Sequence, residues 1–116
     1  MINGDLIDQS VFSQLQEATG SDFIKELVET FLEEGPGIFA ELRSAISTRN
    51  ADQFRRGAHS IKSNAQTFGA ARLAEQARKI EITGLAADME ANSAQISALD
   101  VEFQRTALAL KSMLNG

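Results

Sequence analysis

Residues 51–69 read ADQFRRGAHSIKSNAQTFG, and the spacing of their apolar side chains decides the fold. These side chains recur four, three, four and three residues apart: Phe54, Ala58, Ile61, Ala65 and Phe68. Such spacing places one apolar side chain per turn on the same face of an α-helix. Gly69 follows the last of them and suits the left-handed turn that closes a helix. The stretch therefore predicts a helix over about 51–68 with one face in a hydrophobic core.

The preceding segment carries the same pattern and predicts a long helix over about 21–48. Its apolar positions are Ile24, Leu27, Phe31, Ile38, Leu42 and Ala45, with Gly35 in the same register. Gly35-Pro36-Gly37 interrupts this segment, yet the apolar phase is the same on both sides, which a loop would normally lose. We therefore favour one helix kinked near Pro36 over two helices separated by a break at residues 35–37.

Three further helices follow from the same periodicity, over about 5–18, 70–88 and 93–114. The positions on their core faces are, in chain order, Ile7, Val11, Leu15 and Ala18; Leu73, Ala77, Ile80 and Gly84; and Ile96, Leu99, Phe103, Thr106, Leu110 and Met113. Gly20 is expected to close the first helix, and Asn92 or Ser93 to cap the last one.

The composition agrees with an all-α protein. The chain of 116 residues has one proline and no tryptophan or tyrosine, and Ala, Leu, Glu, Gln and Arg recur throughout. This length allows one core, so residues 1–116 are expected to form a single domain. Short connections favour an antiparallel up-down-up-down four-helix bundle, with the additional short N-terminal helix packed across one end.

Charge and residue usage exclude several classes of protein. The formal net charge of −5 argues against binding to nucleic acids and against binding to an anionic membrane surface. The absence of cysteine and the presence of one histidine argue against a disulfide scaffold and a metal site. We find neither a spanning hydrophobic segment nor a signal peptide, and therefore expect a cytoplasmic protein.

His59 is the only histidine, and it follows the core position Ala58. Successive residues of an α-helix are rotated by about 100°, so His59 should flank the core and face solvent. Arg55, Arg56, Lys62 and Ser63 lie three or four residues away, on the same side of the helix. Residues 53–80 hold six basic residues against Glu75 alone. This indicates a basic surface around His59 that suits a phosphoryl group or an acidic pocket of a partner. The alternative is a solvated helix face without a role.

The string Ala58-His59-Ser60-Ile61-Lys62-Ser63-Asn64-Ala65-Gln66-Thr67-Phe68-Gly69 resembles the signature of histidine-containing phosphotransfer domains. In that family the histidine is followed by any residue, an aliphatic residue, lysine and glycine, and by a second glycine six residues further on. The resemblance extends to the long preceding helix, here Phe23–Ile46. It implies that His59 accepts the phosphoryl group, that Lys62 stabilises it, and that Gly69 lies at the turn between two helices. Ser63 stands at the position where the family usually has glycine.

The resemblance also suggests roles for residues around His59. Glu81 lies one residue beyond the core position Ile80, and in some members a Glu or Gln at this spacing orients the imidazole; a solvated glutamate is the alternative. Further residues are candidates for contacts with a docking partner: Arg55, Arg56, Ser63, Asn64, Gln66, Gly69, Leu6 and Phe12. Leu6 and Phe12 would form an apolar rim, unless they belong to the core.

We therefore expect a monomeric phosphorelay intermediate that takes a phosphoryl group on His59 from a receiver-domain aspartate or a histidine kinase. It would pass the group to a response-regulator aspartate. The partners would be receiver domains of response regulators and of a hybrid sensor histidine kinase, and Mg²⁺ would come with the receiver. No glycine-rich nucleotide-binding loop is present, so a carrier without autokinase activity is expected. The alternatives are a docking module that is not phosphorylated, a phosphoacceptor domain excised from a larger hybrid or chemotaxis-type kinase, and a structural helical protein.

Overall fold

The computed structural model describes residues 6–115, and all the regular structure in this range is helical. Its helices are α2 (Gln9–Thr19), α3 (Ser21–Thr48), α4 (Ala51–Thr67), α5 (Ala71–Thr83) and α6 (Met89–Asn115). The expected all-α class is thus confirmed for the described residues. Residue 5, at which the first helix was expected to begin, lies outside them.

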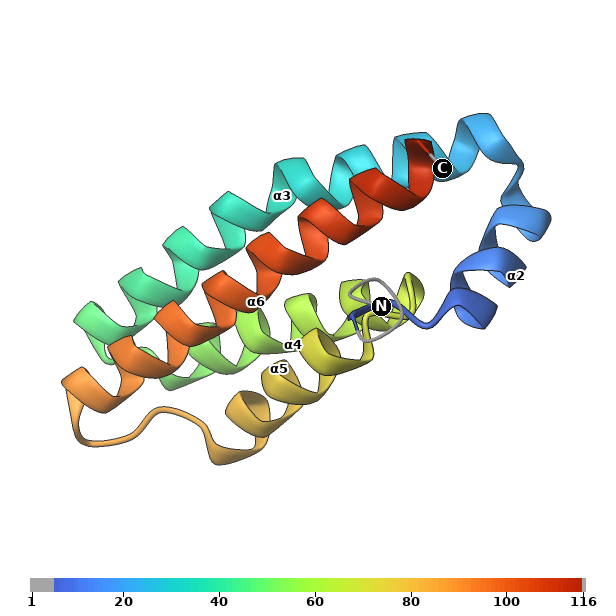
Figure 1. Ribbon diagram of the computed structural model, residues 1–116. Helices are drawn as coiled ribbons and strands as arrows, with labels where there is room; N and C mark the ends of the chain where they lie inside the picture. Colours follow the sequence, from blue (N-terminus) through green and yellow to red (C-terminus); the bar gives the residue numbers. More distant parts are fainter. Residues whose placement is uncertain (1–5, 116) are drawn as a thin grey trace.

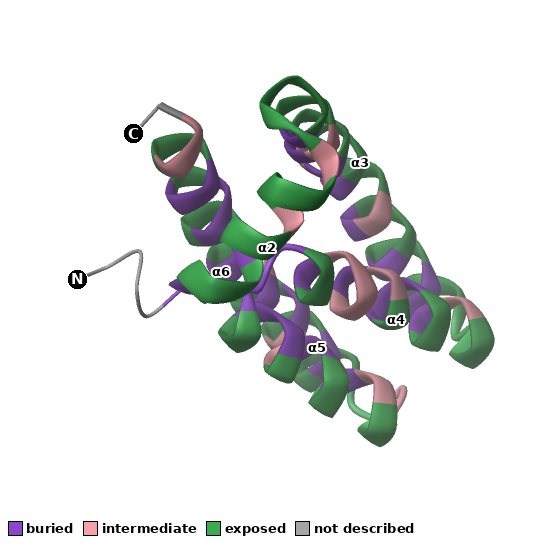
Figure 2. Ribbon diagram, turned by 90° about the vertical axis from the view of Figure 1, so that its right-hand side faces the viewer, coloured by how far each residue is buried: buried purple, intermediate pink, exposed green. Residues whose placement is uncertain are grey.

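The four helices α3 to α6 surround one core (Figure 1). Helix α4 packs against α3 and α5, and α6 packs against the same two helices. The ring of contacts encloses the apolar faces, which appear as the buried inner sides of the helices in Figure 2. The five apolar positions of residues 51–69 are all buried, with exposed fractions between 0% and 3%. The spacing within this segment therefore identified its core face.

Helix α2 lies at one end of the molecule, where α4 turns into α5 (Figure 1). It begins after Asp8, whose carboxylate accepts hydrogen bonds from the N–H groups of Ser10 and Val11. The backbone N–H of Asp8 donates to the carbonyl oxygen of Gly69 at 2.7 Å. This bond fastens the start of α2 to the α4–α5 turn.

The expected face of the first helix was only partly right: Leu15 packs against the core, half-buried, but two other expected positions do not. Ile7 is fully buried, but it precedes the cap at Asp8 and is outside α2. Within α2, Phe12 is the buried residue, whereas Val11 and Ala18 are exposed. Helical phase cannot be carried across a capping residue because the N-cap has extended backbone angles. Counting from Ile7 therefore missed Phe12 and included the exposed Val11 and Ala18.

Helix α3 continues without a break through Pro36. Gly35 is buried directly before this proline, and the ring of Phe103 on α6 lies against it. A Cβ atom at residue 35 would be 2.2 Å from Cζ of Phe103. The Phe103 ring also packs against Phe31 and Phe39, with centroid separations of 5.2 and 5.4 Å. The glycine thus permits the close approach of α3 and α6 that this aromatic cluster needs.

The connection between α5 and α6 differs from the expected one. Helix α5 ends at Thr83 because Gly84 has a positive φ of 72°, and α6 begins at Met89 instead of residue 93. The carboxylate of Asp88 accepts hydrogen bonds from the N–H groups of Glu90 and Ala91. Asn92 is buried, and its amide exchanges two hydrogen bonds with the backbone of Ala86. The capping role expected for Asn92 or Ser93 therefore belongs to Asp88.

The contact between Gly35 and Phe103 predicts a difference between two neighbouring glycines. We expect Gly35→Ala to lower the free energy of unfolding by about 1–3 kcal/mol, because the added methyl group must displace the Phe103 ring. Gly37→Ala is the matched control, since nothing lies within 4 Å of a Cβ at that residue. It should raise stability by about 0.5–1 kcal/mol. Urea denaturation of the two variants measures both values, and equal stabilities would contradict the role given to Gly35.

Candidate functional site

His59 projects from the exposed side of α4, next to the fully buried Ala58. Its side chain is 56% exposed, as helical geometry predicted for a residue one position past the core face. An imidazole in this position can be reached by a partner protein without a change in the fold.

Glu81 on α5 connects the two side chains of α4 that the sequence pattern had singled out. Its Oε2 lies 2.8 Å from Nδ1 of His59, and its Oε1 lies 2.7 Å from Nζ of Lys62. One carboxylate thus bridges an imidazole and an ammonium group. Lys62 and Glu81 are largely covered, with exposed side-chain fractions of 21% and 20%. The reach of Glu81 to His59, inferred from its place after Ile80, agrees with this geometry.

The bridge determines the proton arrangement of the site. The hydrogen bond from Lys62 is the main cause that holds the pKa of the Glu81 carboxyl below its ordinary value of 4.5, and the His59 hydrogen bond adds to it against partial burial. Glu81 is therefore an anion at neutral pH. A carboxylate can only accept a hydrogen bond, so the neutral imidazole carries its proton on Nδ1. The lone pair of His59 then resides on Nε2.

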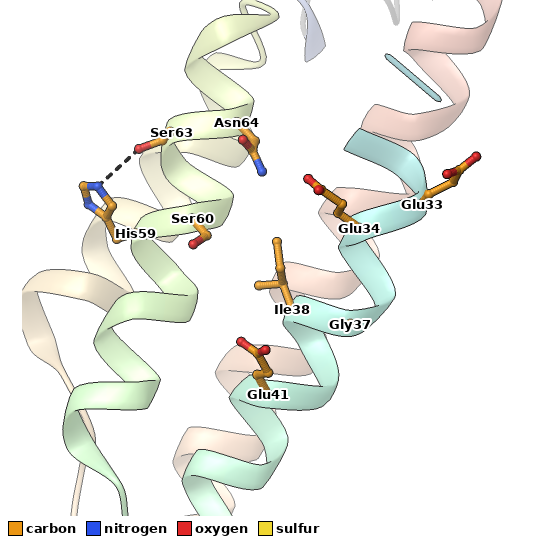
Figure 3. A pocket seen from close by; sticks show the side chains of 9 residues that line it. All are labelled: Glu33, Glu34, Gly37, Ile38, Glu41, His59, Ser60, Ser63 and Asn64. Atoms are coloured by element: carbon orange, nitrogen blue, oxygen red, sulfur yellow. Dashed lines mark hydrogen bonds between the residues drawn. The ribbon is translucent and has the colours of Figure 1, made fainter. Parts of the chain in front are cut away.

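Ser63 lies one turn beyond His59 on the same helix. Its Oγ is 3.3 Å from Nε2 of His59 (Figure 3), whereas Glu81 contacts Nδ1 of the same ring. The imidazole is thus contacted at both nitrogens, by a carboxylate on α5 and by a hydroxyl on α4.

A groove runs between α3 and α4 beside His59 (Figure 3). It is lined by Glu33, Glu34, Gly37, Ile38, Glu41, His59, Ser60, Ser63 and Asn64. The three glutamates all come from α3, so the α3 side of this groove is acidic. The expected basic surface around His59 is therefore absent on the α3 side.

Comparison with known proteins agrees with these observations. The family model of the Hpt domain matches residues 26–115, a range that includes His59, Lys62 and Glu81. The chain belongs to the Hpt domain family. It is 26% identical over 114 residues to the phosphorelay protein LuxU of Vibrio harveyi, a match that covers 98% of this chain and 100% of LuxU.

The fold of this Hpt domain is also that of a solved relative. The crystal structure of the histidine-containing phosphotransfer protein HptB from Pseudomonas aeruginosa PAO1 matches with a TM-score of 0.79. The match covers 95% of each chain at 23% sequence identity. The resemblance first drawn from residues 58–69 is therefore confirmed at the level of the family and of the all-helical fold.

Most of the basic residues of the Hpt domain that were expected to form a positive surface are engaged in ion pairs. Arg55 and Arg56 both contact Asp52, one turn earlier on α4. On α5, Arg78 pairs with Glu75, and its hydrogen bond lowers the pKa of that carboxyl. Asp52 and Glu81 lie directly outside residues 53–80, so the count of charges in that interval did not include these two acidic partners. Lys62 is the cation of this set that contacts the site, and it is paired with Glu81.

Three of the expected docking residues are structural. Leu6 and Phe12 are only 5% and 3% exposed and belong to the hydrophobic core, so they form no apolar rim. Gly69 is buried in the α4–α5 turn with a φ of 76°, and a Cβ there would lie 2.9 Å from the carbonyl oxygen of Asp8. Of the other candidates, Asn64 lines the groove and Gln66 is exposed on α4.

The acidic lining supplied by α3 was missed by the sequence analysis. Glu34, Ile38 and Glu41 are four and three residues apart, a spacing typical of one side of a helix, and this was the available signal. That signal does not say which neighbouring helix the side faces. Among the described residues there is no group of three or more His, Cys, Asp or Glu side chains arranged to hold a metal ion. No described helix is long and apolar enough to cross a membrane.

The depressed pKa of Glu81 predicts a pH-dependent contribution to stability. Because this pKa lies below 4.5 in the folded state, the folded protein binds fewer protons than the unfolded chain. The stabilisation is fully present above pH 4.5 and is lost as the pH falls through the folded-state pKa. We expect the stability difference between wild type and Glu81→Gln to be largest near neutral pH and to shrink in acid. Urea denaturation at a series of pH values measures it, and a difference independent of pH would contradict the bridge.

Proposed function

We propose that this Hpt domain is the intermediate of a phosphorelay that takes a phosphoryl group on Nε2 of His59 from the aspartyl phosphate of a receiver domain. It then donates the group to the aspartate of a response regulator. The observation that carries the proposal is the exposed imidazole whose Nδ1 is held by Glu81, so that Nε2 keeps the lone pair. An exposed nucleophile of this kind needs no pocket of its own because the partner supplies one.

The transfer step balances without a proton transfer. The Nε2 lone pair forms the N–P bond, the P–O bond to the receiver aspartate breaks, and its electron pair leaves with the carboxylate oxygen. The ring gains positive charge and keeps its proton on Nδ1, where the Glu81 carboxylate at 2.8 Å offsets the charge. Return of the group to a second aspartate reverses these events.

Lys62 would act in two ways. Its ammonium group holds Oε1 of Glu81 and so keeps Oε2 directed at Nδ1 of His59. It also places a positive charge one helical turn from the phosphorylated nitrogen, where it offsets the charge of the phosphoryl oxygens.

The remaining parts of the proposal concern the partners and the form of the protein. The receivers would be those of a hybrid sensor histidine kinase and of response regulators, and they would bring the Mg²⁺ that the transfer requires. The Hpt domain would be a cytoplasmic monomer and a carrier without autokinase activity. The cyclic contacts among α3, α4, α5 and α6 support an antiparallel up-down-up-down arrangement of these helices, with α2 across one end.

The first test is phosphoryl acceptance by His59→Gln. A receiver is phosphorylated with a small-molecule donor and Mg²⁺, without ATP, and then mixed with the domain. We expect wild type to gain an acid-labile phosphoryl mass and His59→Gln to gain none, because glutamine has no nucleophilic nitrogen. Mass spectrometry detects the product.

Circular dichroism provides the control for this variant, which should keep the helicity and melting temperature of wild type because residue 59 is exposed. An unfolded variant would assign His59 a structural role instead. Wild type that binds receivers and never gains a phosphoryl group would favour a docking module.

Lys62→Ala tests the ammonium group. We expect the initial rate of phosphoryl acceptance to fall by about tenfold without being abolished, because one charge-assisted hydrogen bond is lost while Nε2 remains. Quench-flow measurements compare it with Lys25→Ala, a lysine on the exposed face of α3 near its start. Equal rates for both variants would remove Lys62 from the mechanism.

A further inference from the structure

The hydroxyl group of Ser63 makes an unusual contact for a serine within a helix. Six other helical hydroxyls in the described residues donate to the carbonyl oxygen four residues earlier: those of Thr19, Thr48, Ser60, Thr67, Thr83 and Thr106. This is the ordinary partner of a serine or threonine inside a helix. Ser63 instead directs Oγ to the side chain four residues earlier, at 3.3 Å from Nε2 of His59 (Figure 3).

The direction of this hydrogen bond follows from the bridge on the other side of the ring. Glu81 keeps the proton of the neutral imidazole on Nδ1, so Nε2 can only accept. The Ser63 hydroxyl must therefore donate. An imidazole nitrogen has a single lone pair in the ring plane, which is the same pair that attacks phosphorus. Ser63 thus occupies the nucleophilic electron pair in the unphosphorylated protein.

We propose that Ser63 is a positioning residue whose hydroxyl donates to Nε2 of His59 before transfer and to a phosphoryl oxygen after it. This inference rests on the proposed function. When the N–P bond forms, Nε2 loses its lone pair and the hydroxyl loses its acceptor. The three phosphoryl oxygens arrive at the same place, and rotation about one side-chain bond lets the hydroxyl donate to one of them. Ser63 itself exchanges only this hydrogen bond, and its hydroxyl proton stays on Oγ.

The hydroxyl would restrain His59 in the unphosphorylated protein and stabilise the phosphoryl group in the phosphorylated protein. Before transfer, the hydroxyl fixes the ring plane but must be released for attack. After transfer, it donates to an anionic oxygen, and such a bond is stronger than one to a neutral nitrogen. The bond weakens as the phosphoryl group leaves, because the loose metaphosphate-like transition state carries less charge on its oxygens. Ser63 therefore prolongs the life of phosphohistidine, which the glycine usual at this position in the family cannot do.

The experiment uses the full chain as wild type, Ser63→Ala and Ser63→Thr, with Thr67→Ala as the matched control. Thr67→Ala removes a hydroxyl from the same helix, but one that donates to a backbone carbonyl. Two readouts are recorded. The ¹⁵N resonance of His59 Nε2 is measured on the neutral ring, and the decay of phosphohistidine is followed by ³¹P NMR after loading from a receiver and removal of that receiver.

We expect Ser63→Ala to move the Nε2 resonance to higher frequency, as loss of a hydrogen-bond donor does, and to shorten the phosphohistidine half-life by about tenfold. Ser63→Thr, which keeps a hydroxyl, and Thr67→Ala should resemble wild type in both readouts. An unchanged Nε2 resonance in Ser63→Ala would overturn the resting hydrogen bond, and an unchanged half-life would overturn its transfer to the phosphoryl group.

The failure of this inference and the failure of the proposed function give different results. A wild-type protein that gains no phosphoryl group contradicts the proposed function and, with it, the second half of the Ser63 exchange. The Nε2 resonance still decides the first half in that case, because it needs no phosphorylation. Normal phosphorylation with equal half-lives in all four proteins would contradict the role of Ser63 alone.

Discussion

The bridge from Glu81 to His59 and Lys62 depends on how α4 packs against α5. The two helices are joined by the turn at Gly69, whose positive φ and lack of a side chain allow the chain to reverse beside Asp8. The turn and the packing of the two apolar faces set the register that brings Glu81 opposite His59. Because both carboxylate oxygens are used, a small shift of α5 along α4 would break two contacts at once. The chemistry of the imidazole is therefore coupled to the packing of this pair of helices.

Local periodicity was sufficient to predict much of this arrangement. The spacing from Phe54 to Phe68 identified the buried face of α4, and a rotation of one residue from Ala58 then placed His59 at the surface. The same reasoning from Ile80 brought Glu81 towards the histidine. The first two predictions needed only the phase within a single uninterrupted helix, whereas the third also required α5 to lie beside α4.

The errors arose where the phase is interrupted or where two helices meet. Leu6 and Phe12 were candidates for an apolar docking rim. The N-cap Asp8, with its extended backbone, lies between them, and both side chains are buried in the core. The pairing of Lys62 with Glu81 and the acidic groove from α3 depend on which helices are neighbours. That information is tertiary, and periodicity in one segment does not contain it.

In the proposed relay, the distribution of charge would limit how a phosphoryl group reaches His59. Arg55 and Arg56 are paired with Asp52, while three glutamates of α3 line the groove between α3 and α4, which His59 also lines. Salt screens such exposed charges beyond about 8 Å, so the remaining field acts only at close range. At that range, a free phosphate dianion in the groove would meet the carboxylates of α3, whereas Lys62 is paired with Glu81 on α5. In the proposed relay the group would instead arrive with the Mg²⁺ of the receiver, which cancels this repulsion. Under the proposed function, an acidic groove that His59 helps to line would therefore favour transfer from a docked partner over transfer from a small anionic donor.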